Sequence, residues 1–248
     1  KSHLPLDFAL LSSHGNDMKN LVITGASSGI GQATAAAFKA TGYNVINLSR
    51  TPCPEAGVTN IACDLSQPNF LQEISAQIQA HLGGVGETVL IHNAALLAND
   101  SVSTTDSSEF RRILEINLVA PNSLNQMLIP LMSKGSSILY VGSTLGEKAV
   151  PNSFSYVTSK HASIGMMRAT CQDLAGTGIH TACVNPGFTD TEMLRAHVPE
   201  DVMPQIAAMS AFERLIQPEE IAQTLLFAAQ SPVLNGAAIN ANLGQIER

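Results

Sequence analysis

Short apolar runs alternate with longer amphipathic stretches along most of this chain. The runs are rich in Val, Ile and Leu and show little polar alternation, which is typical of strands buried on both faces. The pattern predicts seven strands, at residues 20–24, 44–48, 58–62, 88–92, 136–142, 179–184 and 237–241. The stretches between them have helical spacing and predict helices near 29–41, 67–82, 107–132, 153–176 and 218–230.

The regular order of strand and helix indicates an α/β fold. We expect a doubly wound parallel sheet of about seven strands with helices on both faces. Residues 193–216 interrupt this order; they are rich in Met and Ala, include Pro199 and Pro204, and predict a helical insertion or lid. Residues 1–17 begin without Met and lack periodicity, so we expect a tag or a disordered extension there and one domain over 18–248.

Composition narrows the functional classes. The 248 residues are 45% hydrophobic and 13% charged, whereas disordered chains combine low hydrophobicity with high charge. The net charge of −7 offers no basic footprint for a nucleic acid, and no apolar run reaches the roughly 18 residues of a membrane-spanning helix. We therefore expect no nucleic-acid or membrane partner.

The cysteines and histidines show no metal-binding spacing. Cys53, Cys63, Cys171 and Cys183 form no C-x-x-C pair, and the seven histidines form no H-x-x-x-H pair. This spacing favours free thiols, no bound metal and a cytoplasmic location.

A glycine-rich turn follows the first predicted strand, and a helix begins within it. Its glycines permit a tight turn and a close approach of the backbone to a pyrophosphate, and the helix N-terminus offers N–H groups to the phosphates. An ordinary glycine turn is the alternative, and the turn lacks the Lys of a P-loop, which argues against an ATPase. The segment reads Thr24-Gly25-Ala26-Ser27-Ser28-Gly29-Ile30-Gly31.

A tyrosine and a lysine share one face of the predicted helix 153–176. Tyr156 and Lys160 are four residues apart, and Ser143 ends the strand before this helix. A free phenol has a pKa of about 10, and a nearby ammonium lowers the pKa of a phenol by favouring its ionised form. Taken alone, Tyr156 and Lys160 could be an ordinary exposed pair on a helix, and Ser143 could be an ordinary turn residue at the end of a strand. Only their joint occurrence suggests proton transfer.

Several motifs, in order and with matching spacing, resemble the short-chain dehydrogenase/reductase family over nearly all of residues 18–248. The glycine turn is similar to the family's T-G-x-x-x-G-x-G, and Tyr156 and Lys160 match Y-x-x-x-K, thirteen residues beyond the serine. The segment His92-Asn93-Ala94-Ala95 is similar to N-N-A-G but departs from it at both ends. Further matches are Asn117 in Ile116-Asn117-Leu118, Ser143, and Asn185-Pro186-Gly187 followed by Thr191.

The resemblance implies a Rossmann-type dinucleotide-binding catalytic domain that transfers a hydride between a nicotinamide and a carbonyl or secondary alcohol. It implies that Tyr156 is the general acid/base, Ser143 orients the carbonyl, Lys160 reaches the nicotinamide ribose, and Asn117 holds a water. The expected catalytic set is Asn117, Ser143, Tyr156 and Lys160. The expected cofactor contacts are Gly25, Ser27, Ser28, Gly29, Ile30, Gly31, Ser49, Arg50, Asp64, Leu65, Asn93, Ala94, Tyr156, Lys160, Pro186, Gly187, Thr189 and Thr191.

The end of the second predicted strand bears on the choice of cofactor. An acidic residue there binds the ribose of NAD, whereas an arginine accommodates the 2′-phosphate of NADP. The strand ends in Leu48-Ser49-Arg50 with no carboxylate, so we expect NADP(H); the alternative is that Arg50 is a solvated loop residue. Asp64 resembles the family aspartate that contacts the adenine.

The sequence leaves the substrate open. We expect a small ketone, aldehyde or pteridine-like compound. The alternative is a 3-oxoacyl thioester on acyl carrier protein. Reductases of that kind typically offer arginines to the acidic carrier, whereas this chain has Gln172 on the relevant helix and is acidic overall. A catalytically idle NADP-binding regulator is a second alternative, and the complete catalytic set argues against it. A sugar epimerase is disfavoured by the glycine spacing and the chain length. The resemblance also implies a homodimer or homotetramer, with an interface on the helices near 107–132 and 153–176.

Overall fold

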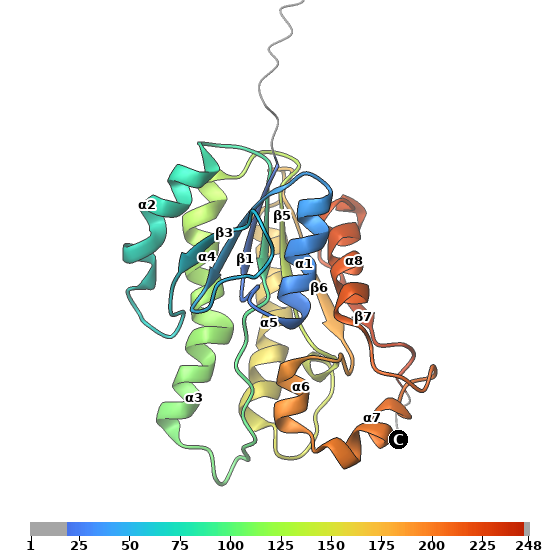
Figure 1. The fold of residues 1–248 in the computed structure, drawn as a ribbon. Coiled ribbons are helices and arrows are strands. Elements are labelled where there is room, and N and C mark those ends of the chain that lie inside the picture. Colours follow the sequence, from blue (N-terminus) through green and yellow to red (C-terminus); the bar gives the residue numbers. More distant parts are fainter. Residues whose placement is uncertain (1–18, 246–248) are drawn as a thin grey trace, which may run out of the picture.

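The computed structural model describes residues 19–245, so the expected extension over 1–17 lies outside the described residues. Within this range one parallel sheet forms the centre of the molecule, with strand order β3-β2-β1-β4-β5-β6-β7 (Figure 1). Each of the seven predicted strands is present, with ends within two residues of the prediction. The strands are β1 (Asn20–Thr24), β2 (Asn44–Ser49), β3 (Thr59–Ala62), β4 (Thr88–His92), β5 (Ser137–Val141), β6 (His180–Pro186) and β7 (Ala238–Ala241).

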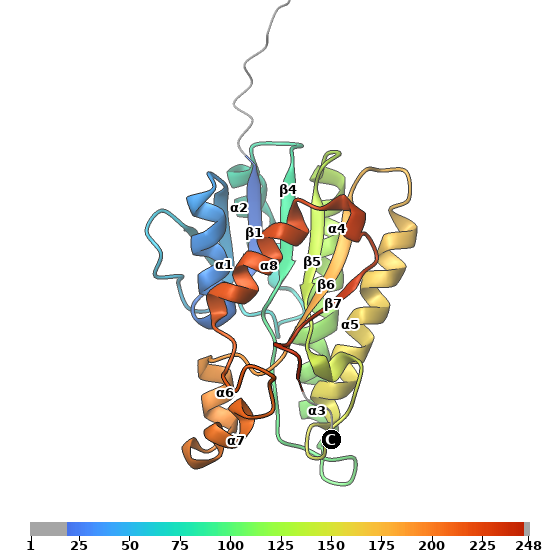
Figure 2. The ribbon, with the colours of Figure 1, turned by 90° about the vertical axis from the view of Figure 1, so that its right-hand side faces the viewer.

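Helices cover both faces of the sheet, which confirms the predicted doubly wound fold (Figure 2). Apolar side chains of α2, α4 and α5 pack on one face, and those of α1 and α8 pack on the other. The described α-helices are α1 (Gly29–Ala40), α2 (Phe70–Leu82), α3 (Ser107–Leu114), α4 (Ala120–Leu128), α5 (Phe154–Asp173), α6 (Glu192–His197), α7 (Met203–Ala207) and α8 (Pro218–Ala229). None of them is long and apolar enough to cross a membrane.

The strand order reverses direction at β1, which lies between β2 and β4. In a parallel sheet, a crevice opens at such a switch point, beyond the carboxyl ends of the strands. The segment over 193–216 forms α6, a short 3₁₀ turn and α7 beyond this same edge, as the predicted helical insertion required (Figure 1). The fold therefore directs the ends of β1, β4 and β5 toward α6.

The single helix predicted over 107–132 is wrong in detail. The structure has α3, then a π-helical turn over Glu115–Val119, then α4 and a 3₁₀ turn over Ile129–Leu131. A π turn widens the helix locally, and such turns are frequent at functional sites. Here the turn includes Asn117, whose side chain is buried.

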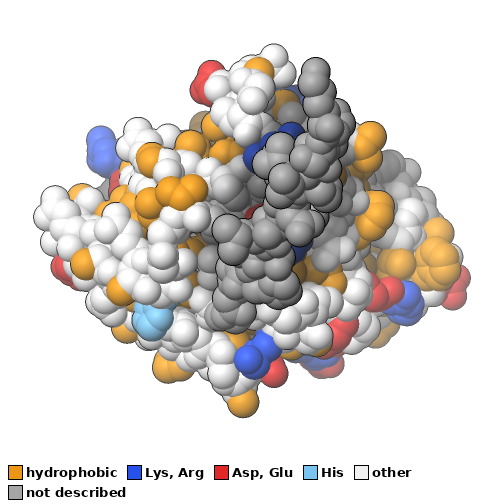
Figure 3. Space-filling model, turned by 90° about the horizontal axis from the view of Figure 1, so that it is seen from above, with side chains coloured by type: hydrophobic (Ala, Val, Ile, Leu, Met, Phe, Trp, Pro, Cys, Tyr) orange, Lys and Arg blue, Asp and Glu red, His pale blue; other side chains and the backbone are white. Residues whose placement is uncertain are grey.

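The opposite edge, at the amino ends of the strands, carries acidic and basic side chains scattered among apolar ones (Figure 3). Lys19, before β1, pairs there with Glu87, before β4, with 2.7 Å between Nζ and Oε1. The visible described residues of this face form no continuous basic surface.

Candidate active site

A cavity of about 660 Å³ opens at the carboxyl ends of the strands, beside α6. Its walls bring together every expected cofactor contact and three of the four expected catalytic residues, Ser143, Tyr156 and Lys160. Asn117 is the exception, since it lies buried behind the wall. Residues far apart in the sequence thus meet at one crevice.

The glycine turn forms a closely packed cradle at one end of the cavity. Gly25 and Gly29 have φ angles of 71° and 54°, which favour glycine. A Cβ on Gly31 would lie 2.2 Å from the carbonyl oxygen of Gly25, so the third glycine permits the turn to pack against the helix. No side chain caps the N-terminus of α1 at Ser28, and no acidic residue lies in its first turn. These features fit the phosphates of a dinucleotide.

Asn93 holds the glycine turn from the neighbouring strand. Its Nδ2 donates to the carbonyl oxygens of Gly25, over 2.8 Å, and Thr24, over 3.0 Å. In return the Thr24 hydroxyl accepts hydrogen bonds from the backbone N–H groups of Asn93 and Ala94. The part of the N-N-A-G segment that this chain retains therefore joins β1 to β4 at the switch point.

His92, one of the two departures from that segment, has a structural role. Its Nε2 lies 2.8 Å from Oδ1 of Asn125, and its ring lies 4.9 Å from that of Tyr140. Burial lowers the pKa of His92 to about 4, so the ring is neutral at physiological pH. This network holds His92 through Nε2, while its buried Nδ1 has no hydrogen-bond partner among the described residues; His92 is not part of the cavity lining.

Lys160 connects the helix α5 to the end of β5. Its side chain is 5% exposed, and its Nζ donates to the carbonyl oxygen of Val141 over 2.7 Å. The same Nζ lies 5.3 Å from the centre of the Tyr156 ring. Ser143, two residues beyond β5, begins a 3₁₀ turn, and its Oγ accepts a hydrogen bond from the N–H of Leu145 over 3.1 Å. A phenol, an ammonium and a hydroxyl therefore line the same cavity.

Asn117 joins three segments behind this wall. Its Oδ1 accepts from the N–H of Leu96 over 2.8 Å, and its Nδ2 donates to the Leu96 carbonyl oxygen and to Oγ of Ser159. The π turn thereby ties the loop after β4 to α5. The role in holding a water, implied by the resemblance, stays a prediction.

The far end of the cavity has charged groups of both signs. Arg50 lines it and is exposed, directly after β2. Asp64 lines it as well, and hydrogen bonds from the backbone and side chain of Ser66, together with a smaller effect of the Arg50 charge, hold the pKa of this carboxyl below its usual range. An ionised carboxylate and a guanidinium are thus available at this end.

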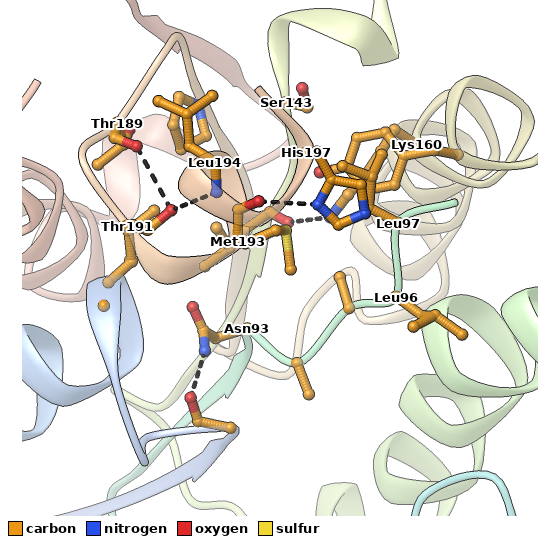
Figure 4. Close-up of a pocket in the computed structure, with 18 of the residues that line it drawn as sticks. Asn93, Leu96, Leu97, Ser143, Lys160, Thr189, Thr191, Met193, Leu194 and His197 are labelled. Carbon is orange, nitrogen blue, oxygen red and sulfur yellow. Dashed lines mark hydrogen bonds between the residues drawn. The ribbon is translucent and has the colours of Figure 1, made fainter. Parts of the chain in front are cut away.

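Several lining residues carry no sequence motif. His197 lines the cavity from the end of α6, and its Nδ1 lies 2.8 Å from the carbonyl oxygen of Met193 (Figure 4). Oε1 of Gln245 is buried against Gly187 and has no hydrogen-bond partner within the described range. Leu96, Leu97 and Arg112 also line the cavity without belonging to a motif. The sequence offered one signal for His197: it lies four residues after Met193, so the two share a face of α6.

Four further residues, two beside the catalytic motif and two on the helical insertion, differ in their relation to the cavity. Met193 lines it, whereas Met203 is buried elsewhere. Glu147 and Phe154 are not part of its lining: Glu147 accepts a hydrogen bond from Asn240, and Phe154 packs on Phe110 with 5.6 Å between ring centres. No group of three or more metal-ligating side chains lies within residues 19–245.

Comparison with known proteins agrees with this geometry. A family model described as enoyl-(acyl carrier protein) reductase matches residues 25–245. Protein FixR of Bradyrhizobium diazoefficiens is 31% identical over 92% of this chain and 86% of its own length. The 3-oxoacyl-[acyl-carrier-protein] reductase FabG of Thermotoga maritima is 28% identical over 92% and 98%. The ligand-free structure of Thermoplasma acidophilum aldohexose dehydrogenase superposes with a TM-score of 0.84 at 28% identity, over 92% of this chain and 93% of that one. The chain belongs to the short-chain dehydrogenase/reductase family, whose members are oxidoreductases.

Proposed function

We propose that this protein is an NADP(H)-dependent oxidoreductase that interconverts a small carbonyl compound and its secondary alcohol. The observation that carries the proposal is the position of Lys160, whose Nζ lies 5.3 Å from the Tyr156 ring in the cavity that the glycine turn also lines. A phenol beside a buried ammonium can exchange a proton, and the turn can bind a dinucleotide. One cavity therefore combines the two requirements of a nicotinamide-dependent reductase.

The chain's own residues fit the cofactor along the cavity. The N–H groups at the uncapped start of α1 would hold the pyrophosphate, and the Asp64 carboxylate would accept a hydrogen bond from the adenine. Lys160 uses one N–H for Val141, its one bonded partner within the described residues, and has two more for the ribose. The unpartnered Oε1 of Gln245, against Gly187, can accept from the carboxamide.

The preference for NADP(H) rests on Arg50. Its guanidinium lines the cavity directly after β2, where no carboxylate stands at positions 48–50. A planar fork of N–H donors suits a phosphate, and the hydroxyl of Ser49 lines the same wall. The positive charge therefore favours the 2′-phosphate over a bare ribose hydroxyl.

The proton is moved by Tyr156. When bound, the nicotinamide supplies the hydride that adds to the carbonyl carbon. The Tyr156 hydroxyl donates its proton to the carbonyl oxygen as the C=O double bond becomes a single bond, and solvent then reprotonates the phenolate. Ser143 donates a hydrogen bond to the same oxygen and orients it. The Lys160 ammonium stabilises the negative charge left on Tyr156.

The test is reduction of a panel of ketones and aldehydes with NADPH, followed by nicotinamide absorbance. Tyr156→Phe removes one oxygen and keeps the ring, so NADPH binding persists while turnover falls about 10² to 10⁴-fold. Tyr43→Phe is the matched control, because Tyr43 is buried against Phe38, outside the cavity lining. Near-normal turnover in Tyr156→Phe would contradict the proposal and reopen the idle-regulator alternative.

A second candidate function is reduction of a 3-oxoacyl thioester. It is favoured by the similarity to the Thermotoga maritima carrier-protein reductase and by an acetoacetyl-CoA reductase of Rhizobium meliloti that is 29% identical over 90% of this chain. Including acetoacetyl-CoA in the carbonyl panel separates the two candidates. A kcat/KM for acetoacetyl-CoA far above that for every free ketone would favour the thioester.

We also propose that the protein is a cytoplasmic homodimer or homotetramer. All four cysteines lie in the described part of the chain and are free thiols, which fits a reducing compartment. The outer faces of α4 and α5 are the expected interface. Size-exclusion chromatography with light scattering measures the assembly, and a monomer at micromolar concentration would contradict this expectation.

A further inference from the structure

The substrate end of the cavity combines an apolar wall with basic side chains on one side. Leu96 and Leu97 enter from the loop after β4, and Met193 and Leu194 enter from α6 (Figure 4). Arg112, on α3, and Lys148, between β5 and α5, line the same cavity. We propose that the substrate carries an anionic group, which Arg112 binds while the apolar wall holds the body of the molecule. This inference rests on the proposed oxidoreductase function and specifies its substrate class.

The position of Arg112 relative to Tyr156 is held by contacts between their helices. The loop that leads to α3 is bonded to the first turn of α5, where the backbone N–H of Ser155 donates to Oδ1 of Asp100 over 3.0 Å and the Ser155 hydroxyl donates to the same carboxylate. Phe110 of α3 packs on Phe154 of α5. Arg112 and Tyr156 therefore belong to one rigid wall, and a bound anion has a defined place relative to the reacting carbonyl.

Arg112 can leave its present ion pair and bind a ligand with little loss of stability. Its partner is Glu109, one helical turn earlier, with 3.2 Å between Nη1 and Oε2. The two side chains are 45% and 59% exposed, and such surface pairs contribute little to stability. A substrate carboxylate or phosphate can accept two parallel hydrogen bonds from the guanidinium. In a partly desolvated cavity this contact is stronger than the exposed pair that it replaces.

The distribution of charge along the cavity supports an anion on this side. Two lining residues are acidic, Asp64 at the adenine end and Glu192 on α6. Glu192 also lines a second cavity on the other side of α6, so it stands at the margin of the first. No carboxylate of the α3 side lines the cavity within residues 19–245. Glu109, which pairs with Arg112 outside the cavity lining, is the carboxylate that an anionic substrate would displace.

The chemical class is an apolar ketone with an acidic group remote from the carbonyl. The acidic group is a carboxylate on a small oxo acid or a phosphate on an acyl thioester. Two pairs of compounds distinguish these sources: levulinate against methyl levulinate, and acetoacetyl-CoA against the neutral acetoacetyl N-acetylcysteamine thioester. Each pair presents the same ketone with and without negative charge.

The experiment measures the ratio of kcat/KM between the charged and the neutral member of each pair, with NADPH in excess. We expect wild type to prefer the charged member of one pair by about tenfold or more, mainly through KM, and to lose most of this preference in Arg112→Gln. Arg112→Lys should keep part of it, because the charge remains but the planar fork is lost. The preference should also fall at high ionic strength.

Arg111→Gln is the matched control. Arg111 precedes Arg112 on the same helix, is exposed and bonds to the carbonyl oxygen of Ser107, but it is not part of the cavity lining. It changes the net charge by the same amount, so any effect of overall charge appears in both variants. An equal loss of preference in the two variants overturns the proposal, and so does a wild-type ratio near one for both pairs.

A binding measurement separates this inference from the proposed function. If wild type reduces none of the four compounds, the oxidoreductase proposal fails for this class, and thermal unfolding with each compound tests the anion site alone. Stabilisation of wild type and Arg111→Gln, but not of Arg112→Gln, by levulinate or acetoacetyl-CoA supports the site. Equal shifts with the charged and neutral members overturn it.

Discussion

The ammonium group of Lys160 donates a hydrogen bond of 2.7 Å to the backbone carbonyl of Val141, the last residue of β5. This contact joins the second turn of α5 to the edge of the sheet from which Ser143 projects. The hydrogen bond thereby fixes α5, which carries Tyr156, beside the end of β5, which Ser143 follows. The lysine therefore has a structural task as well as its proposed chemical one.

Replacement of Lys160 should therefore affect folding and chemistry together. Lys160→Met leaves the buried Val141 carbonyl without its partner, and we expect the free energy of unfolding to fall by about 1–3 kcal/mol. NADPH affinity should fall as well, because the proposed contact of Lys160 with the nicotinamide ribose is lost.

Urea unfolding and cofactor titration measure these effects. Lys39→Met is the control, because Lys39 also donates to a backbone carbonyl, that of Gly57, but at the surface. We expect a change within about 0.5 kcal/mol for this variant. Equal stability losses in the two variants would show that the buried Lys160–Val141 hydrogen bond contributes no more to the free energy of unfolding than the exposed Lys39–Gly57 one.

Arg50 should govern the choice between the two nicotinamide cofactors. Arg50→Ala removes a charge-assisted contact with the 2′-phosphate, so NADPH binding should weaken about ten- to a hundredfold. NADH binding should hardly change, which makes it the internal control. Titration of both cofactors by fluorescence decides the matter. Equal losses, or a wild-type preference for NADH, would mean that Arg50 is a solvated loop residue.

Gly31 should tolerate no side chain. In Gly31→Ala the new Cβ would lie 2.2 Å from the Gly25 carbonyl oxygen and 2.5 Å from Nδ2 of Asn93, so the turn must open. We expect a loss of about 1–3 kcal/mol in stability and at least a tenfold loss in cofactor affinity. Gly86→Ala is the control, because a Cβ at Gly86 would meet no atom within 4 Å. Calorimetry with and without NADPH measures both quantities, and an unchanged affinity in Gly31→Ala would argue against phosphate binding at this turn.

His92 should make stability depend on pH. Its folded-state pKa of about 4 lies below the ordinary value, so unfolding takes up a proton once the pH is below about 6.5. The neutral ring's contribution is fully present above that pH and is lost progressively as the pH falls toward 4. Between pH 7 and pH 5 this loss amounts to about 2 kcal/mol.

His92→Asn carries no titrating ring, so its stability should fall less steeply on acidification than that of wild type. Urea unfolding at both pH values gives the two slopes, and the other histidines affect both proteins alike. Parallel slopes would contradict a buried neutral His92.

Much of the fold could be predicted because its signals are local. The Val-, Ile- and Leu-rich runs placed the strands within two residues, since a strand buried on both faces must be apolar along its length. The helix over 107–132 was harder, because a π turn at Glu115–Val119 depends on partners that Asn117 finds at Leu96 and Ser159. Apolar periodicity does not report such contacts.

The sequence by itself determined the order of the elements, the glycine turn and the spacing of Tyr156 and Lys160, because each depends on residues that are near neighbours in the chain. Only the tertiary structure decided that Arg112, His197 and Gln245 line the same cavity. These residues are separated by scores of positions and belong to three different segments, so no local pattern connects them. Packing of helices and loops around the switch point of the sheet brings them together, and that packing depends on contacts between the segments, which no single stretch of sequence contains.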